Sequence, residues 1–248
     1  MTLIRQTEKP VGESRRTLLR AAVAGGALAT GGLALGAVPA TAAPRTATSR
    51  RHPRPTTPSA ALRELAAGNR RWRTFHQQHP HESGAVRETL VTGQHPFAVI
   101  LGCIDSRVPP ELIFDQGLGD LMTVRAAGEV LDEAVLGSVA YGVLELGTPL
   151  VVVLGHQACG AVSAAVRAEE TGEELPAHIQ YIADRIRPAI DHSQQGEARI
   201  ESTIDRNVAM VTRQLAEEPD LAARIATGAL AVVGAHYELS SQRVHTLT

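Results

Sequence analysis

Several residue types are scarce in this chain of 248 residues, and each scarcity excludes a class of protein. Two cysteines are too few for a disulfide-dense scaffold, which needs several bridges. Lys9 is the only lysine, the formal net charge is −2, and no block of basic residues provides the footprint of a nucleic-acid-binding protein. Aromatic residues make up only 3% of the chain, so a core must be built mainly from Ala, Val, Leu and Ile. The 44% of hydrophobic residues that are present indicate a folded globular protein.

Residues 1–43 resemble a twin-arginine signal peptide. Arg15 and Arg16 precede the uncharged residues 21–43, which are rich in Ala, Gly and Thr and include the small-x-small cleavage pattern ATA at 40–42. Such a signal carries folded proteins across a membrane, so we expect export to the cell envelope or the exterior. A retained transmembrane anchor is the alternative, because the stretch is long enough to span a bilayer. Its weak hydrophobicity and the cleavage pattern favour a signal that is removed.

The rest of the chain divides into a linker and one domain. Residues 44–58 hold four prolines and four arginines, which predicts an extended or flexible linker. Residues 59–248 are long enough for a single domain, in which the hydrophobic pattern alternates between two periods. The strands predicted from this pattern are 97–102, 121–125, 150–154 and 230–237. The helices predicted from it are 60–77, 133–146, 159–170, 174–190 and 197–218.

This alternation predicts an α/β fold, with a mainly parallel sheet flanked by helices and an N-terminal helical arm. The arm is the helix 60–77, for which we expect Ser59 as the N-terminal cap. Its apolar stripe is predicted to be Leu62, Leu65, Trp72 and Phe75.

Metal-binding side chains follow two of the predicted strands. Cys103 comes directly after the strand 97–102, and His156 and Cys159 follow the strand 150–154. Because parallel strands end on the same side of a sheet, these residues can meet in one crevice. Two thiolates and an imidazole form a zinc ligand set, and three protein ligands leave one position open, as in catalytic sites. Asp105 and Arg107, two residues apart, are predicted to pair beside this site.

Two simpler interpretations of the cysteines stay open. Each cysteine can be a small buried apolar residue, and in an exported protein the two can form a disulfide. Neither interpretation accounts for His156 beside Cys159, or for Asp105 and Arg107 beside Cys103. We therefore favour a metal site.

The segments 103–108 (CIDSRV) and 156–160 (HQACG), in this order and spacing, resemble the β-class carbonic anhydrases. The resemblance extends from the helix at 65–72 to the strand at 232–237. It implies the β-carbonic anhydrase fold, one Zn²⁺ per chain, and reversible hydration of carbon dioxide to bicarbonate and a proton by a zinc-bound hydroxide.

The resemblance also assigns roles to individual residues. Cys103, His156 and Cys159 would hold the zinc, and Asp105 and Arg107 would form the family's catalytic dyad. Two further residues would bind substrate: Gln94 and Tyr141. The family forms homodimers or larger homo-oligomers with active sites at the dimer interface, so we expect the same here, with no nucleic-acid partner and no stable membrane anchor after signal cleavage.

Two other functions are compatible with the sequence. A hydrolase of carbonyl sulfide or carbon disulfide on the same scaffold would share the motifs and differ in access to the pocket. A non-catalytic secreted module that binds zinc or contains a disulfide is the other alternative. The presence of both Asp105 and Arg107 argues against that module.

Overall fold

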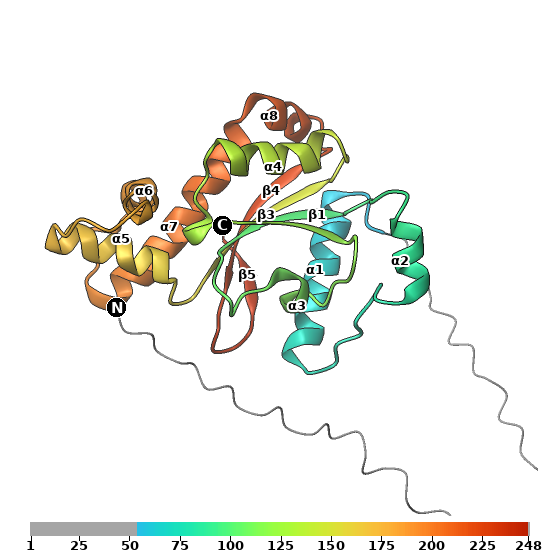
Figure 1. Ribbon diagram of the computed structural model, residues 1–248, viewed down its shortest axis with the longest axis horizontal. Helices are drawn as coiled ribbons and strands as arrows, with labels where there is room; N and C mark the ends of the chain where they lie inside the picture. The colour runs from blue at the N-terminus through green and yellow to red at the C-terminus, as the bar shows by residue number, and fades with distance from the viewer. Residues whose placement is uncertain (1–53, 248) are drawn as a thin grey trace, which may run out of the picture. The chain divides into compact units, whose positions relative to one another are not determined.

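The computed structural model describes residues 54–247, which form an α/β domain (Figure 1). Its strands are β1 (Ala98–Gly102), β2 (Leu121–Arg125), β3 (Leu150–His156), β4 (Ala231–Tyr237) and β5 (Val244–Thr246). Its α-helices are α1 (Pro58–Arg73), α2 (Gly84–Leu90), α3 (Pro110–Ile113), α4 (Glu133–Leu144), α5 (Gly160–Thr171), α6 (Ile179–Ile186), α7 (Gly196–Glu217) and α8 (Pro219–Ala226). Two 3₁₀ turns are present as well, Ala127–Glu129 and Arg187–Ala189.

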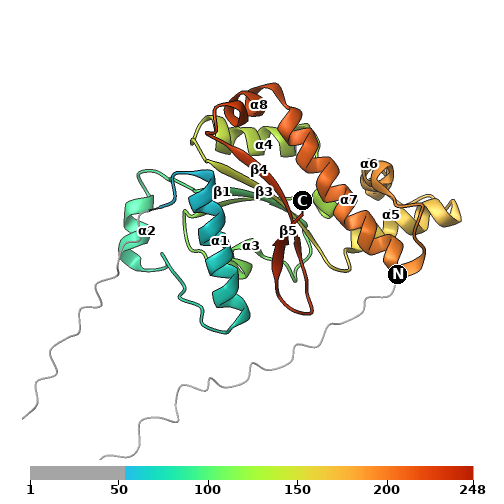
Figure 2. The same cartoon turned by 180° about the vertical axis from the view of Figure 1, so that it is seen from behind.

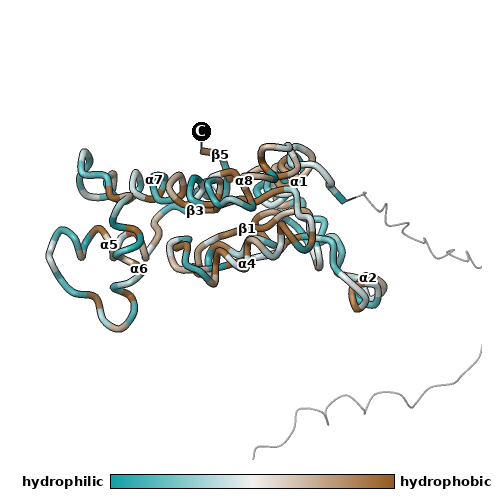
Figure 3. The backbone as a smooth tube through the Cα atoms, turned by 90° about the horizontal axis from the view of Figure 1, so that it is seen from above, coloured by the Kyte–Doolittle hydropathy of each residue, from teal (hydrophilic) through white to brown (hydrophobic). Residues whose placement is uncertain are grey.

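The strands form one sheet in the order β2-β1-β3-β4-β5. The first four strands are parallel, and β5 runs antiparallel to β4. Every residue of β1 and β3 is buried, which explains why both strands are continuous apolar runs and not alternating ones. In Figure 3 the tube is brown, and so apolar, along β1. The predicted fold with a mainly parallel sheet is therefore confirmed.

Helices cover both faces of the sheet, because alternate strand residues point to opposite faces. On one face Ile100 and Val152 pack in a core that also includes residues of α1, α3, α5 and α6. On the other face Val99 and Val151 pack with residues of α4, α7 and α8. Figures 1 and 2 show α1 and α2 toward one end of the sheet and α5 and α6 toward the other.

The predicted helical arm differs from the observed helix at both ends. Helix α1 starts at Pro58, which the sequence pattern assigns to the linker, and its cap is Thr57 and not Ser59. Thr57 Oγ1 accepts a hydrogen bond from the Ala60 amide at 3.3 Å, and proline is suited to the first helical position because it lacks an N–H group. Beyond Arg73 the chain leaves the helix, and Phe75, at φ 56°, is exposed and not part of the apolar stripe.

Short elements account for the other differences. The sequence pattern did not indicate α2, α3, α8 or β5, which have between three and eight residues each and so contain too few periods to recognise. The helix predicted at 174–190 is shortened to α6 and a 3₁₀ turn. Its start is delayed because Ala177, just after Pro176, adopts φ 53°.

The predicted signal peptide and most of the predicted linker lie outside the described residues. Among residues 54–247, no helix has both the length and the apolar character needed to cross a membrane.

Candidate metal centre

Three elements bring two thiols and an imidazole together at the carboxyl end of the sheet. Cys103 follows β1 directly, His156 is the last residue of β3, and Cys159 is the N-terminal cap of α5. All three residues are buried, and their ligand atoms lie within 4.8 Å of one another. The structure therefore assembles the predicted ligand set from segments that are more than 50 residues apart in the chain.

The donor atoms fit a metal ion and do not fit a disulfide. The Sγ atoms of Cys103 and Cys159 are 4.0 Å apart, far beyond the S–S bond length of about 2.05 Å. Two sulfurs bound to a tetrahedral zinc at about 2.3 Å are separated by roughly 3.8 Å. His156 Nδ1 donates to the Gln157 carbonyl at 2.9 Å, and Nε2 is buried without a hydrogen-bond partner among the described residues. This unpartnered lone pair is the one that a metal would use.

The two thiols shift each other's pKa in opposite directions. The hydrogen bond from the Cys159 thiol lowers the pKa of Cys103, and His156 and the Gly128 amide lower it further. The same contact with Cys103, together with burial, raises the pKa of Cys159, because a second thiolate would be repelled by the first. A dication would remove this repulsion, so the site is chemically suited to bind Zn²⁺.

Gly128, in the 3₁₀ turn after β2, contacts the sulfur of Cys103. The Gly128 amide lies 3.4 Å from Cys103 Sγ and is oriented to donate a hydrogen bond. Gly128 has φ 61°, and a Cβ there would lie 2.7 Å from Ile186 Cδ1, so the approach depends on glycine. The next residue, Glu129, is buried, and burial raises the pKa of its carboxyl well above the usual value. Burial therefore favours the protonated form of this carboxyl beside the two sulfurs.

Asp105 and Arg107 form the predicted pair. Arg107 Nε donates to Asp105 Oδ1 at 2.9 Å and an Arg107 terminal nitrogen donates to Oδ2 at 2.7 Å, which makes the pair bidentate. The Arg107 amide also donates to Oδ1 at 2.9 Å. These hydrogen bonds from Arg107 lower the pKa of Asp105 to about 2, so this carboxylate is ionised at neutral pH.

Two charged residues that the sequence did not single out hold these loops in place. Arg125, at the end of β2, donates to the Cys103 carbonyl at 2.8 Å and to the Asp105 carbonyl at 2.6 Å. Glu201 of α7 accepts from the Ala158 amide at 2.9 Å, next to Cys159. Only its position at the end of a predicted strand could have identified Arg125 from the sequence. No sequence feature identified Glu201.

A cavity of about 350 Å³ opens beside Cys103 and Asp105. Its other walls are apolar and come mainly from α5, α6 and the segment between them: Ala161, Ala164, Leu175, Ile179, Ile182 and Ala183. A small apolar molecule in this cavity would therefore contact the ionised Asp105 and a candidate metal ligand at the same time.

The two predicted substrate-binding residues lie at the opposite end of the sheet within one chain. Gln94 is exposed and precedes β1, whose five residues span roughly 13 Å before Cys103. Tyr141 is 51% exposed and lies in the last turn of α4, where the adjacent Gly142 packs against Val99 near the start of β1. Their contact with substrate stays a prediction.

The family model described as carbonic anhydrase matches residues 98–244. Carbonic anhydrase 2 of Mycobacterium tuberculosis is 44% identical over 190 residues, which cover 76% of this chain and 92% of that protein. Carbonic anhydrase of Mycolicibacterium smegmatis is 40% identical over 191 residues, which cover 76% of this chain and 93% of that protein.

The fold of this chain is similar to solved structures of β-carbonic anhydrases. The β-carbonic anhydrase CcaA has a TM-score of 0.62 at 25% identity, covering 75% of this chain and 95% of that one. The enzyme CafA of Aspergillus fumigatus has a TM-score of 0.61 at 26% identity, covering 76% of this chain and 89% of that one.

Proposed function

The chain belongs to the β-class carbonic anhydrase family and is a carbonate dehydratase, and we propose that it works with one zinc ion held by Cys103, His156 and Cys159. The observation that carries this assignment is the buried, unpartnered Nε2 of His156 beside two thiols whose sulfurs are 4.0 Å apart. When bound, zinc would supply the Lewis acidity that ionises water near neutral pH and so provides the hydroxide nucleophile for carbon dioxide.

In this proposal the ligand loops are held rigid by hydrogen bonds before any substrate arrives. The Gln157 carbonyl fixes the ring of His156 with Nε2 toward the thiols, and the Gly128 amide stabilises negative charge on Cys103. These contacts leave Nε2 of His156 free to bind a metal and favour the thiolate form of Cys103.

Asp105 is proposed to orient the attacking oxygen by accepting its hydrogen bond. An acceptor must stay ionised, and the bidentate contact with Arg107 holds the pKa of Asp105 at about 2. The same Arg107 donates to the Ala158 carbonyl at 3.3 Å, which ties the dyad to the loop that carries Cys159. Arg107 is therefore proposed to position Asp105.

The apolar cavity beside Asp105 is proposed to hold carbon dioxide. The substrate has no charge, whereas bicarbonate is an anion, so apolar walls favour the substrate over the product. The apolar side chains of α5 and α6 that line the cavity would therefore favour release of bicarbonate.

We propose that a second copy of the chain completes the pocket with its Gln94 and Tyr141. Among the described residues β2 is an edge strand, paired only with β1. A twofold axis through that edge would pair two β2 strands in opposite directions. This pairing would place the amino end of one sheet beside the carboxyl end of the other. Gln94 and Tyr141 of one copy would then lie beside the pocket of the other copy.

Zinc analysis together with stopped-flow assays tests the proposed function. We expect about one zinc per purified chain and carbon dioxide hydration that disappears on removal of the metal by dipicolinate and returns with Zn²⁺. Parallel assays with carbonyl sulfide and carbon disulfide are expected to show slower turnover. Full activity in protein shown to contain no metal would contradict the zinc assignment, and faster sulfide turnover would contradict the substrate.

We also propose that the chain is exported in the folded state by a twin-arginine signal in residues 1–43. The support is chemical, because two free thiols 4.0 Å apart are protected from oxidation if they bind zinc before leaving a reducing compartment. Replacing Arg15 and Arg16 with Lys is expected to retain active, zinc-loaded precursor inside the cell, measured by fractionation. Normal export of that variant would contradict the route.

A further inference from the structure

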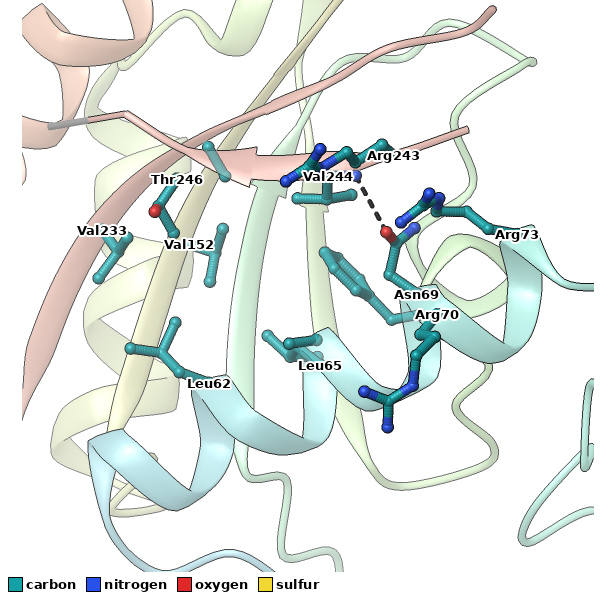
Figure 4. A pocket seen from close by; sticks show the side chains of 13 residues that line it. Leu62, Leu65, Asn69, Arg70, Arg73, Val152, Val233, Arg243, Val244 and Thr246 are labelled. Carbon is teal, nitrogen blue, oxygen red and sulfur yellow. Dashed lines mark hydrogen bonds between the residues drawn. The ribbon is translucent and has the colours of Figure 1, made fainter. Parts of the chain in front are cut away.

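A second cavity lies between α1 and the sheet and has no lining residue in common with the cavity beside Cys103. Its volume is about 280 Å³. Its apolar lining comes from α1, from the sheet and from Phe114, which follows α3, and the polar residues Asn69 and Thr246 line it as well. Figure 4 shows Leu62 and Leu65 extending from α1 toward Val152 of β3 and Val244 of β5.

The rim of this cavity is basic, and none of its lining residues is acidic. Arg70, Arg73 and Arg243 line it, and no Asp or Glu does. All three arginines are exposed, and none of their guanidinium groups forms a hydrogen bond or an ion pair with another described residue. The contrast is Arg71, on the same helix, which pairs with Asp115 and Glu64. Three arginines without a hydrogen-bonded acid thus line a partly apolar cavity in a chain whose net charge is −2.

Asn69 holds this cavity in a fixed shape. Its side-chain nitrogen donates to the Ile113 carbonyl at 3.2 Å and to the Gln242 carbonyl at 3.0 Å, and its oxygen accepts from the Val244 amide at 3.0 Å. Figure 4 shows the last of these bonds joining α1 to β5, with Arg73 and Arg243 on either side of Asn69. Because Asn69 is buried, the bonds are shielded from water, and the cavity is formed before any ligand binds.

We propose that this cavity binds an amphiphilic organic anion, a medium-chain carboxylate, with its chain among the apolar residues and its carboxylate among the arginines of the rim, of which Arg73 and Arg243 lie beside Asn69 in Figure 4. Guanidinium groups match carboxylates in geometry and charge. A small hydrated anion would gain nothing from the apolar interior, and a neutral chain would leave the arginines unused. A volume of about 280 Å³ leaves space for a chain of medium length, such as that of octanoate.

Calorimetric titration of the zinc-loaded full chain with octanoate tests the proposal. We expect saturable binding of one octanoate per chain at this site, at least tenfold tighter than binding of octanol or acetate. The first comparison isolates the charge and the second isolates the apolar chain. Equal affinity for octanol, or no saturable octanoate binding at millimolar concentration, would overturn the proposal.

Matched variants locate the site, because a carboxylate can also bind a metal. The triple variant Arg70→Gln, Arg73→Gln, Arg243→Gln is expected to weaken octanoate binding about a hundredfold, since each lost charged hydrogen bond weakens binding several-fold. The control replaces three exposed arginines that do not line the cavity: Arg63→Gln, Arg167→Gln and Arg213→Gln. It removes the same net charge, so we expect less than a twofold change.

Filling the cavity provides an independent variant. Ala66→Leu adds bulk at a lining position on the exposed side of α1 and is expected to weaken octanoate binding more than tenfold while the melting temperature stays within a few degrees. Binding that is unaffected by both Ala66→Leu and the arginine triple variant would place octanoate elsewhere and overturn the proposal.

Discussion

The two ends of the parallel sheet differ sharply in how their side chains are held. At the carboxyl end, Cys103, His156 and Cys159 are buried, and hydrogen bonds from neighbouring loops support them. At the amino end, Gln94 is exposed and Tyr141 is half-exposed, and neither side chain forms a hydrogen bond with another described residue. The carboxyl end is organised within one chain, whereas we propose that Gln94 and Tyr141 at the amino end act in the site of a second copy.

Removing a ligand at the carboxyl end should have the largest effect. Cys159→Ser is expected to abolish zinc binding and activity, because a hydroxyl is a poor zinc ligand. Loss of a ligand present at about a thousand times its Kd removes about 4 kcal/mol, so the melting temperature should fall by roughly 8–16 °C. Calorimetry and zinc analysis measure both effects, with Ser138→Ala on the exposed face of α4 as the control. Full zinc retention in Cys159→Ser would refute the ligand assignment.

Changing the dyad should affect catalysis but not the metal. Asp105→Asn is expected to retain one zinc per chain and lose about a hundredfold in kcat/KM, since an amide can donate where the carboxylate accepts. Stopped-flow hydration assays and zinc analysis on the same sample give the two values. Activity within threefold of the parent would show that Asp105 does not orient the attacking oxygen.

Loosening the support of the ligand loops should have a smaller effect. Arg125→Gln removes the charged donor to the Cys103 and Asp105 carbonyls, and we expect kcat/KM to fall about tenfold, within the range for outer-sphere residues of metal sites. Arg125→Lys should recover part of the activity because it can reach one carbonyl, and Arg213→Gln should have no effect. An Arg125→Gln variant as active as the parent would contradict the positioning role.

Substitutions at the amino end should have the smallest effect, and should act across copies. The double variant Gln94→Ala, Tyr141→Ala is expected to lower kcat/KM about fivefold, the size of one or two lost hydrogen bonds. Co-expressed with Asp105→Asn chains and purified as hybrids by two tags, it should give about half the parent activity, because one site per hybrid has every group intact. Activity equal to the mean of the two variants would place the complete site within one chain.

The polar site could be predicted from the sequence more fully than the helix boundaries could. Cys103 and His156 each follow an apolar run long enough to be recognised as a strand, and their relation depends only on both strands being parallel. The start of α1 at Pro58 and the loss of Phe75 from its apolar face depend on local caps and a left-handed residue, which hydrophobic periodicity does not report.

By itself the sequence determined the α/β class and the end of the sheet at which Cys103, His156 and Cys159 meet, because parallel strands all leave the sheet on one side. Only the tertiary structure decided that Arg125 reaches the Cys103 loop and that Gly128 donates to its sulfur, since both contacts depend on the register of β1 against β2. The cavity between α1 and the sheet was also decided only by the tertiary structure. Asn69 and Val244, whose bond closes it, are 175 residues apart, and no local pattern links residues at that separation.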